Sequence, residues 1–400
     1  MKRIYLDHAA ATPLDPQAKE AMLPYLTSEF GNPSALYKEG VTARNAVEDA
    51  RARIAKVLFA QSDEIIFVGS GTESDNLAIL GVVEAYEKKH DARPHVVTSV
   101  IEHPAVYHTI QKLERRGKIT ATYVPVLANG IIDVSELKTA LTKKTALVSV
   151  MYANNEIGTV QPITEIAKVI RAHRNANKSE YPYLHTDACQ AMNYMDLQVE
   201  RLGVDLLTFN GSKLYGPKGV GGLYIKRSVE IAQQTMGGGQ EFCLRAGTEN
   251  VAGIVGLATA MEEVEKTKAE ESERLRDLQT YFIDEVLKSI PKSILNGDRE
   301  ERLPNNVHIS VPSVDNELLV IEMDAHGIAC SAQSACKSRN VEQSHVISAL
   351  IEGGRQPRLG GEGALRFSMG RATTKEDIAT TVKALVRAVE KIQKTASEDN

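Results

Sequence analysis

The region between residues 64 and 226 alternates short apolar runs with segments of helical periodicity. Repeated strand–helix units of this length predict an α/β fold with a mainly parallel sheet covered on both faces. Asp133, with Glu136 three residues later, also fits a capping box at the start of one helix. We expect strands at residues 64–68, 95–100, 122–126, 146–151, 183–187, 204–209 and 220–226, with helices from about residue 105 and over 163–172.

The length of the chain predicts two domains, because 400 residues exceed the ~250–300 at which one hydrophobic core stops growing. Residues 251–287 have the pattern of one long helix, apolar at first and then charged, which suits a helix that leaves one core and reaches a second. We expect a large domain over residues 17–262. A smaller α+β domain would comprise residues 1–16 and 263–400, with an amphipathic helix at its end.

Composition excludes several classes of protein. A net charge of −5 argues against direct nucleic-acid binding, which needs a basic face. No apolar stretch reaches the ~18 residues of a membrane span. Charged residues follow Met1 at the positions where a signal peptide has its apolar region, so we expect a cytoplasmic protein. Four cysteines in 400 residues are too few for a disulfide framework. Their spacing does not match that of a zinc site, so no metal is expected.

Lys213 and Asp187 are the most informative residues for function. Lys213 follows an apolar, strand-like run and precedes a glycine-rich stretch that ends at Gly222. A lone lysine there would ordinarily be a surface residue in a turn. Asp187, however, ends another strand-like run. A Schiff-base lysine with an aspartate for a pyridinium nitrogen is the smallest constellation of a pyridoxal phosphate (PLP) enzyme, so the pair predicts PLP as cofactor.

Other polar groups follow the expected strands. Residues 68–76 join a strand to a helix through two glycines, and a helix N-terminus with the Thr72 hydroxyl suits a phosphate, although many such turns look alike. His103, the segment 154–158 and the segment 187–190 also follow strand ends. Ligands of α/β sheets bind at these ends, so the polar groups predict one convergent pocket.

Two further segments stand out near the C-terminus. Small polar residues surround Cys336, which predicts a mobile loop with an accessible thiol, and Lys337 beside it favours the thiolate. Cys330 fits better as a small packing residue at the root of this loop. Arg366 lies in an apolar, strand-like run, where its guanidinium suits a bidentate grip on a carboxylate or, equally, a structural salt bridge.

Together these segments resemble the cysteine desulfurases of the iron–sulfur assembly and nitrogen-fixation type, within the fold-type I aminotransferase superfamily. The resemblance runs nearly from end to end, and the long loop around Cys336 resembles the first group of the family. The segments that carry it are Tyr5-Leu6-Asp7, Gly31-Asn32-Pro33-Ser34, Gly71-Thr72-Glu73-Ser74, Glu102-His103, Asn154-Asn155-Glu156-Ile157-Gly158, Asp187-Ala188-Cys189-Gln190, Lys213-Leu214-Tyr215-Gly216-Pro217-Lys218-Gly219, Gly237-Gly238-Gly239-Gln240-Glu241, Arg245-Ala246-Gly247-Thr248 and Ser334-Ala335-Cys336.

The resemblance implies a fold-type I PLP-dependent transferase, with a mainly parallel seven-stranded sheet in the large domain and a smaller α+β domain. It implies that Lys213 binds PLP and moves protons, that His103 stacks on the ring, and that Cys336 attacks the substrate sulfur to form a persulfide. Arg366 and Asn32 would hold the substrate carboxylate. The residues implied to bind the cofactor are Gly71, Thr72, His103, Asn155, Asp187, Gln190, Asn210, Ser212, Lys213 and Thr248, the last from the second subunit of a homodimer.

The sequence departs from the family pattern at three places. The family's Ser-x-His-Lys is Asn210-Gly211-Ser212-Lys213 here, so a shorter hydroxyl replaces a histidine that contacts phosphate. Its Ser-Gly-Ser-Ala-Cys is Ala332-Gln333-Ser334-Ala335-Cys336, and its Gln-Glu-Arg-Gly is Gln240-Glu241-Phe242-Cys243. These changes put cofactor affinity and loop behaviour in question.

Three functions therefore compete. The first is a desulfurase that converts L-cysteine to alanine and hands the sulfur to an acceptor protein, such as an iron–sulfur scaffold or a relay protein for tRNA thiolation. The second is a selenocysteine lyase, against which Cys336 argues mildly. The third is a weakly active scaffold that binds assembly partners. Absorbance of a lysine-bound PLP that responds to L-cysteine would separate an enzyme from a scaffold.

Overall fold

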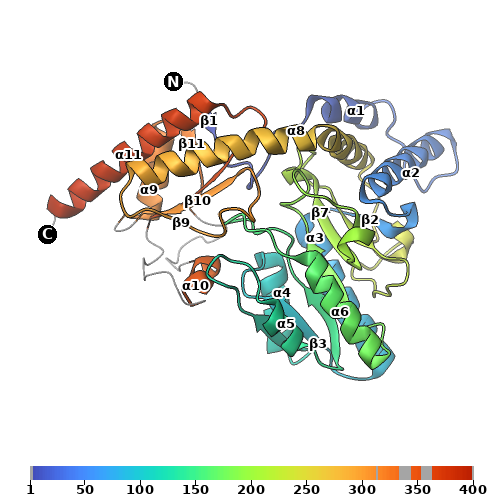
Figure 1. Cartoon of the computed structure of the whole chain (residues 1–400). Coiled ribbons are helices and arrows are strands. Elements are labelled where there is room, and N and C mark those ends of the chain that lie inside the picture. The colour runs from blue at the N-terminus through green and yellow to red at the C-terminus, as the bar shows by residue number, and fades with distance from the viewer. Residues whose placement is uncertain (1–2, 312–313, 333–343, 353–362, 399–400) are drawn as a thin grey trace.

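In the computed structural model, a larger and a smaller unit are joined by one long helix, α8 (Val251–Ser289) (Figure 1). The structure describes residues 3–311, 314–332, 344–352 and 363–398. The first half of α8, from Val251 to Val264, packs in the core of the larger unit, and the second half, from Leu275 to Val286, packs in the core of the smaller one. The expected helix between two cores is therefore confirmed.

The larger unit contains a seven-stranded sheet with the order β2-β8-β7-β6-β5-β3-β4. Strand β8 is antiparallel to both of its neighbours, and the other pairs are parallel. The expected mainly parallel sheet is confirmed. The strands are β2 (Ile65–Val68), β3 (His95–Ser99), β4 (Thr120–Val124), β5 (Thr145–Ser149), β6 (Tyr183–Asp187), β7 (Leu206–Asn210) and β8 (Gly221–Ile225).

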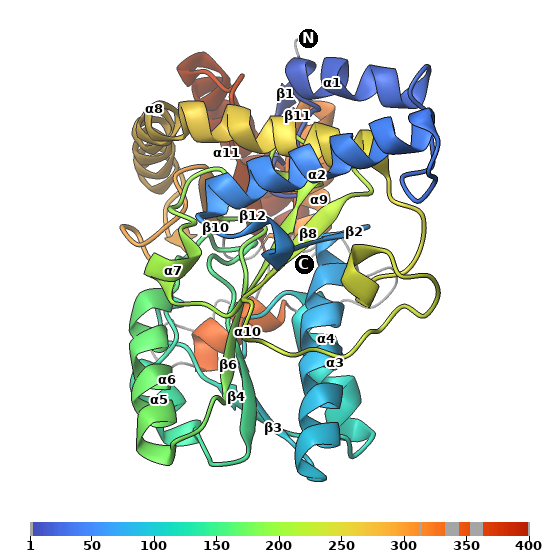
Figure 2. The ribbon, with the colours of Figure 1, turned by 90° about the vertical axis from the view of Figure 1, so that its right-hand side faces the viewer.

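Helices cover both faces of this sheet (Figure 2). Successive strand residues point to opposite faces, so Leu206 packs in the cluster that contains α3 and α4, while Leu207 packs in the cluster that contains α2, α6 and the start of α8. Burial on both faces is the reason apolar residues predominate in most of these strands, although buried polar residues such as His185 and Thr208 lie among them. The helices of this unit are α1 (Pro16–Leu26), α2 (Lys38–Leu58), α3 (Gly71–His90), α4 (Pro104–Arg115), α5 (Val134–Ala140), α6 (Ile163–Asn177) and α7 (Val199–Leu202), with 3₁₀ turns η1 (Ser62–Glu64), η2 (Gly211–Lys213) and η3 (Glu241–Cys243).

Local hydrogen bonds explain where the expected boundaries were wrong. Strand β4 ends at Val124 because Pro125 has no N–H to donate to the ladder. Strand β5 ends at Ser149, and Met151 instead donates its N–H to the carboxylate of Glu102 at 3.0 Å. Asp133 caps α5 as expected, but its own N–H donates to the carbonyl of Pro125, so the reciprocal half of the capping box is absent.

The smaller unit combines two short sheets with helices. Strand β1 (Ile4–Tyr5) pairs in parallel with β11 (Ile328–Ala329), so the N-terminal segment is part of this unit. An antiparallel sheet contains β9 (Ile294–Leu295), β10 (Asn306–Ser310) and β12 (Ala364–Ser368) in the order β12-β10-β9. Helices α9 (Asn316–Ala325) and α11 (Lys375–Glu398) pack with it.

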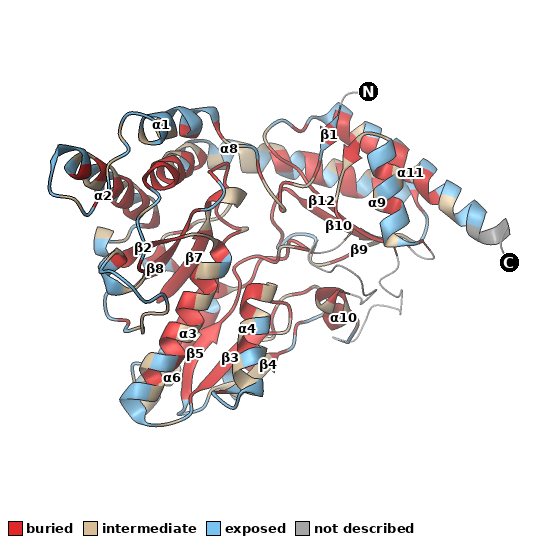
Figure 3. Ribbon diagram, turned by 180° about the vertical axis from the view of Figure 1, so that it is seen from behind, coloured by how far each residue is buried: buried red, intermediate tan, exposed pale blue. Residues whose placement is uncertain are grey.

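Helix α10 (His345–Glu352) follows in sequence from the smaller unit but packs on the larger one. Its Val346, Ile347 and Leu350 are buried in the same cluster as β5 and α6, as the burial colours of Figure 3 illustrate. The domain boundaries expected at residues 17–262 and 263–400 stay a prediction. Among the described residues, no helix combines the length and apolar character that a membrane span needs.

Candidate active site

The sheet brings the two key residues to one edge. Asp187 is the last residue of β6, and Lys213 lies in η2, directly after the neighbouring parallel strand β7. His103 follows β3, and the segment from Asn154 to Gly158 follows β5. Because parallel strands end at the same edge, polar groups that are distant in sequence converge there. The strand ends therefore meet at one edge, as expected, and the convergent pocket there stays a prediction.

The Lys213 side chain is held by the N-terminal segment. Its Nζ donates to the carbonyl oxygens of Ala9 at 2.9 Å and Ala10 at 2.5 Å, and the Nε2 of Gln190 donates to the same Ala9 carbonyl at 3.0 Å. Burial lowers the pKa of the Lys213 ammonium, and the nearby Arg366 lowers it further. A lysine with a lowered pKa provides the neutral amine that reacts with an aldehyde.

His103 is a neutral imidazole whose tautomer follows from its contacts. Its Nδ1 accepts the N–H of Ala105 at 3.2 Å as the N-cap of α4, so the ring proton is on Nε2. Burial lowers the pKa of His103. A ring nitrogen of His103 and carboxylate oxygens of Asp75 and Asp187 lie within 4.8 Å of one another. This spacing could also suit a metal ion, which would compete with a cofactor ring for Asp187 and His103.

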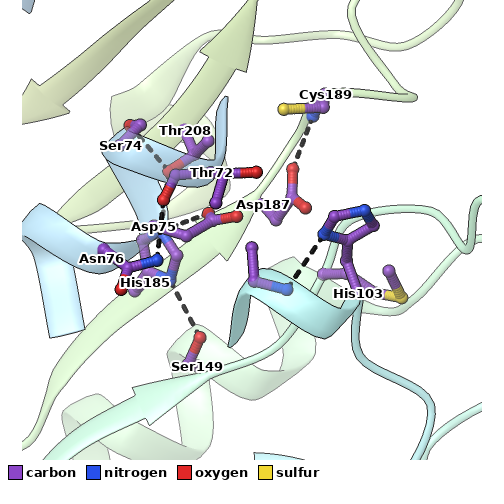
Figure 4. Close-up of polar contacts among 12 residues, drawn as sticks. Thr72, Ser74, Asp75, Asn76, His103, Ser149, His185, Asp187, Cys189 and Thr208 are labelled. Carbon is purple, nitrogen blue, oxygen red and sulfur yellow. Dashed lines mark hydrogen bonds and ion pairs between the residues drawn. The ribbon is translucent and has the colours of Figure 1, made fainter. Parts of the chain in front are cut away.

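A buried hydrogen-bond network behind Asp187 joins three strands and a helix (Figure 4). His185 on β6 bonds Ser149 on β5 through Nδ1 at 2.8 Å and Thr208 on β7 through Nε2 at 3.0 Å. Thr208 in turn shares a hydrogen bond of 2.9 Å with Ser74 on α3. Complete burial lowers the pKa of His185 to about 4, so the ring is neutral at pH 7. The network fixes the relative positions of the elements that carry the site.

The N-terminus of α3 forms a narrow cradle at the same edge. The Ser70 side chain caps the helix by accepting the N–H of Glu73 at 3.1 Å. A Cβ at Gly71 would lie 2.8 Å from the Sγ of Cys189 and 3.3 Å from the Cβ of Asn210, so only glycine fits. Thr72 is exposed in the first turn. Free N–H groups and the helix dipole make this cradle suited to an anion such as phosphate.

Arg366 is buried in β12, with only 4% of its surface exposed. Its Nη2 donates to the Asp7 carboxylate at 2.8 Å, and its Nη1 donates to the carbonyl of Asn155 at 2.9 Å. Its Nε is buried without a hydrogen-bond partner among the residues that the structure describes. The structural salt bridge weighed from the sequence is therefore present, and one donor is left for a further acceptor.

Comparisons with known proteins identify the family of the chain. The aminotransferase class-V model matches residues 4–380. The chain belongs to the aminotransferase class-V family. It is 46% identical, over 98% of its length and 96% of the relative's, to the cysteine desulfurase IscS of Dictyoglomus turgidum.

Two solved structures extend the comparison. A NifS-like protein has a TM-score of 0.88 and 32% identity, covering 97% of this chain and all of its own. The structure of SspA in complex with cysteine has a TM-score of 0.78 and 31% identity, covering 92% of this chain and 99% of its own. These findings confirm the resemblance drawn from the sequence.

Some residues that the family resemblance pointed to are not brought together within one chain. Asn32 belongs to the loop between α1 and α2, and its Oδ1 accepts the N–H of Ser34 at 2.9 Å. Figure 3 shows this loop at the outer edge of the larger unit, away from β12. The single chain therefore does not place Asn32 on Arg366. Thr248 is exposed just before α8. Their roles, and those of Asn155 and Ser212, stay predictions.

Cys336 lies outside the described residues, as does Gln333. The ends of that segment are described. On one side, Ser331 exchanges backbone hydrogen bonds with Arg366 at 3.1 and 2.7 Å. On the other side, Ser344 donates to the buried Glu156 carboxylate at 2.6 Å. The loop that the family resemblance assigns to Cys336 is thus tied at both ends to residues at or beside the site.

Sequence reasoning missed the part played by the N-terminal segment. Tyr5-Leu6-Asp7 contributed to the resemblance, but no role followed from it, because backbone carbonyls such as those of Ala9 and Ala10 leave no mark in a sequence. It also missed Asp75, which lies in the motif after Gly71 and could have been found as a polar residue on an otherwise buried helix face.

Proposed function

We propose that this chain is a PLP-dependent cysteine desulfurase, which converts L-cysteine to L-alanine and transfers the sulfur to Cys336. The observation that carries the proposal is the pairing of a low-pKa Lys213 with a buried Asp187 at the ends of adjacent parallel strands, in a chain similar to cysteine desulfurases over nearly its whole length. Neither a selenocysteine lyase nor a scaffold is favoured by a specific observation.

The residues present fit PLP. Lys213 would bind its aldehyde carbon, Asp187 would accept the N–H of its ring nitrogen, and the cradle at Gly71 and Thr72 would take its phosphate. His103 would lie against the ring, with Gln190 and Asn155 near its oxygen substituent. When bound, PLP supplies an electron sink for the bonds around the substrate α-carbon.

The substrate carboxylate is assigned to Arg366. A buried guanidinium with an unused Nε–H costs free energy, and an incoming carboxylate removes this cost. Asp7 keeps the guanidinium in place and supplies the counter-charge before substrate arrives. This arrangement favours an α-amino acid over an amine that lacks a carboxylate.

Proton transfer is assigned to Lys213 Nζ and His103 Nε2. The lowered pKa of Lys213 allows its amine to take a proton from the substrate and return it, and neutral His103 has its Nε2–H free to donate. The sulfur must then meet a thiolate. Burial and Asp7 raise the pKa of Cys330 to about 12, so Cys330 remains a thiol at pH 7. The family resemblance assigns the role to Cys336.

A homodimer is part of the proposal. Large apolar side chains on and after α1 and α2 are exposed, among them Leu26, Phe30, Leu36 and Tyr37. Exposed large apolar side chains that gather in one short stretch of the chain support association with a second copy. The exposed Thr248 would then contribute to the phosphate site of the partner. A sulfur-acceptor protein remains a prediction from the family resemblance, and a cytoplasmic location remains a prediction from the composition.

The proposal is tested with the purified protein, PLP and L-cysteine. We expect a visible absorbance band from the lysine-bound cofactor, its change on addition of L-cysteine, and release of alanine. Lys213→Ala should lose the band and all turnover, whereas Lys218→Ala, a nearby lysine control, should keep both. Cys336→Ser should keep the band and its response to L-cysteine but release alanine only at background. A normal band in Lys213→Ala would overturn the assignment.

A further inference from the structure

Asp75 is a buried carboxyl that lies directly behind the proposed ring-nitrogen residue. It is on α3, one turn after the anion cradle, and only 1% of its surface is exposed. Its Oδ1 has no hydrogen-bond partner among the residues that the structure describes. In Figure 4 its carboxyl points toward Asp187, and oxygens of the two groups lie within 4.8 Å. A buried carboxyl in this state requires an explanation.

Within the part of the chain that the structure describes, Lys213 acts on Asp187, but no cation acts on Asp75. The side chain nearest to Asp75 that could be charged is His185, whose Nε2 is 3.7 Å from Asp75 Oδ1, but burial lowers the pKa of His185 to about 4 and the ring is neutral. The Asp187 carboxyl raises the pKa of Asp75, and Glu102 raises it by less; burial raises the pKa of Glu102 itself to about 8, so Glu102 is mostly neutral at pH 7. Two carboxylates this close and this buried cannot both ionise at neutral pH.

The proton of the pair belongs to Asp75. Burial raises the pKa of Asp75 well above its usual range, Asp187 raises it further, and a hydrogen bond with Thr208 offsets these effects only in part. Asp187, in contrast, accepts the backbone N–H of Cys189 at 2.9 Å, and a hydrogen bond from a backbone donor favours the ionised form of a carboxyl.

We propose that Asp75 is a positioning residue of the cofactor site, a carboxylic acid that keeps its proton at neutral pH so that Asp187 alone carries the negative charge that accepts the pyridinium N–H. A second negative charge at this distance would increase the proton affinity of Asp187 and draw the proton off the ring nitrogen. The neutral acid prevents this. The inference rests on the proposed function, since it assumes that PLP is the cofactor.

The test begins without cofactor. The difference between the infrared spectra of the wild-type apo-protein and Asp75→Asn at neutral pH should contain the C=O stretch of one protonated carboxyl. Burial raises the pKa of Glu102 to about 8, so Glu102 contributes the same stretch to both spectra and cancels. If the difference spectrum lacks the band, the proton is elsewhere and the proposal fails. This measurement is independent of PLP, so it can stand or fall separately from the proposed function, which fails if the wild-type protein does not bind PLP.

The second arm measures PLP affinity by titration of apo-protein. Asp75→Asn is neutral and isosteric, so its Kd should stay within about threefold of wild type. Asp75→Leu removes the hydrogen bond with Thr208, which belongs to the network that positions the strand ends, and its Kd should rise by about tenfold, the size of one hydrogen bond. An Asn variant as weak as the Leu variant would mean that Asp75 is ionised, and a Leu variant equal to wild type would remove the positioning role. Should the Leu variant not fold, the infrared comparison decides alone.

Discussion

Glu241→Gln should cost far more stability than the loss of an ordinary ion pair. Arg51 and Glu241 form a two-point contact at 2.8 and 2.9 Å, and their side chains are only 3% and 2% exposed. The Glu241 carboxylate also accepts the N–H of Phe67 at 2.7 Å. This pair fastens the segment of residues 241–243, whose φ angles of 47°, 57° and 64° are strained for residues other than glycine.

The size of the expected loss in the free energy of unfolding follows from the burial of the pair. Removing one partner of a buried pair leaves the other charge without compensation, at a cost of about 3–5 kcal/mol. The amide of the variant would also direct an N–H toward the guanidinium. An exposed pair provides the matched control, since Arg227 and Asp63 are 66% and 50% exposed, and Asp63→Asn should cost only about 0.2–1 kcal/mol.

Urea denaturation of the two variants and the wild type measures the difference. We expect the first unfolding transition of Glu241→Gln to move to clearly lower urea, while Asp63→Asn stays close to wild type. The double variant Arg51→Met/Glu241→Leu should recover part of the loss, because it buries no unpaired charge. Equal small effects of Glu241→Gln and Asp63→Asn would refute the reasoning.

Three further predictions concern other contacts. Ser344→Ala removes the donor to the buried Glu156 and should cost about 1.5–3 kcal/mol in denaturation, with faster amide exchange in α10. In the folded protein the pKa of His185 is lowered to about 4, whereas in the unfolded chain it is about 6.5, so between these pH values only the unfolded state binds the proton. The free energy of unfolding should therefore fall as the pH is lowered from about 6.5 to about 4. In His185→Gln this fall should be smaller by about 3 kcal/mol. Ser212→His should tighten PLP binding by about 10- to 150-fold, the size of one hydrogen bond to a charged group, if the phosphate site has room for an imidazole. Titration of apo-protein with PLP measures this change. Equal or weaker binding would mean that the site is adapted to the smaller residue.

The alternation of strands and helices allowed the α/β sheet to be predicted, because burial on both faces favours a short apolar run in most of the strands. The exact strand ends could not be predicted, since they depend on partners distant in sequence, such as the Glu102 carboxylate that binds the N–H of Met151. The long helix α8 was predictable because its composition changes where it passes from one core to the other.

The candidate site could be proposed from the sequence where it uses side chains at strand ends, as with Lys213 and Asp187. It was not predictable where it uses backbone, as with the Ala9 and Ala10 carbonyls that hold Lys213 Nζ. The proton on Asp75 was also out of reach, because it depends on how close Asp187 lies and on the neutral state of His185.

The most direct test of the central claim is to locate the cofactor on the chain. The PLP-loaded protein is reduced with borohydride, which makes the lysine–cofactor bond permanent, and its peptides are mapped by mass spectrometry. Lys213 sits at the end of β7 with a pKa lowered by burial, so the modified peptide should carry the label on Lys213. Labelling of Lys218 instead, or of no lysine at this edge of the sheet, would contradict the account.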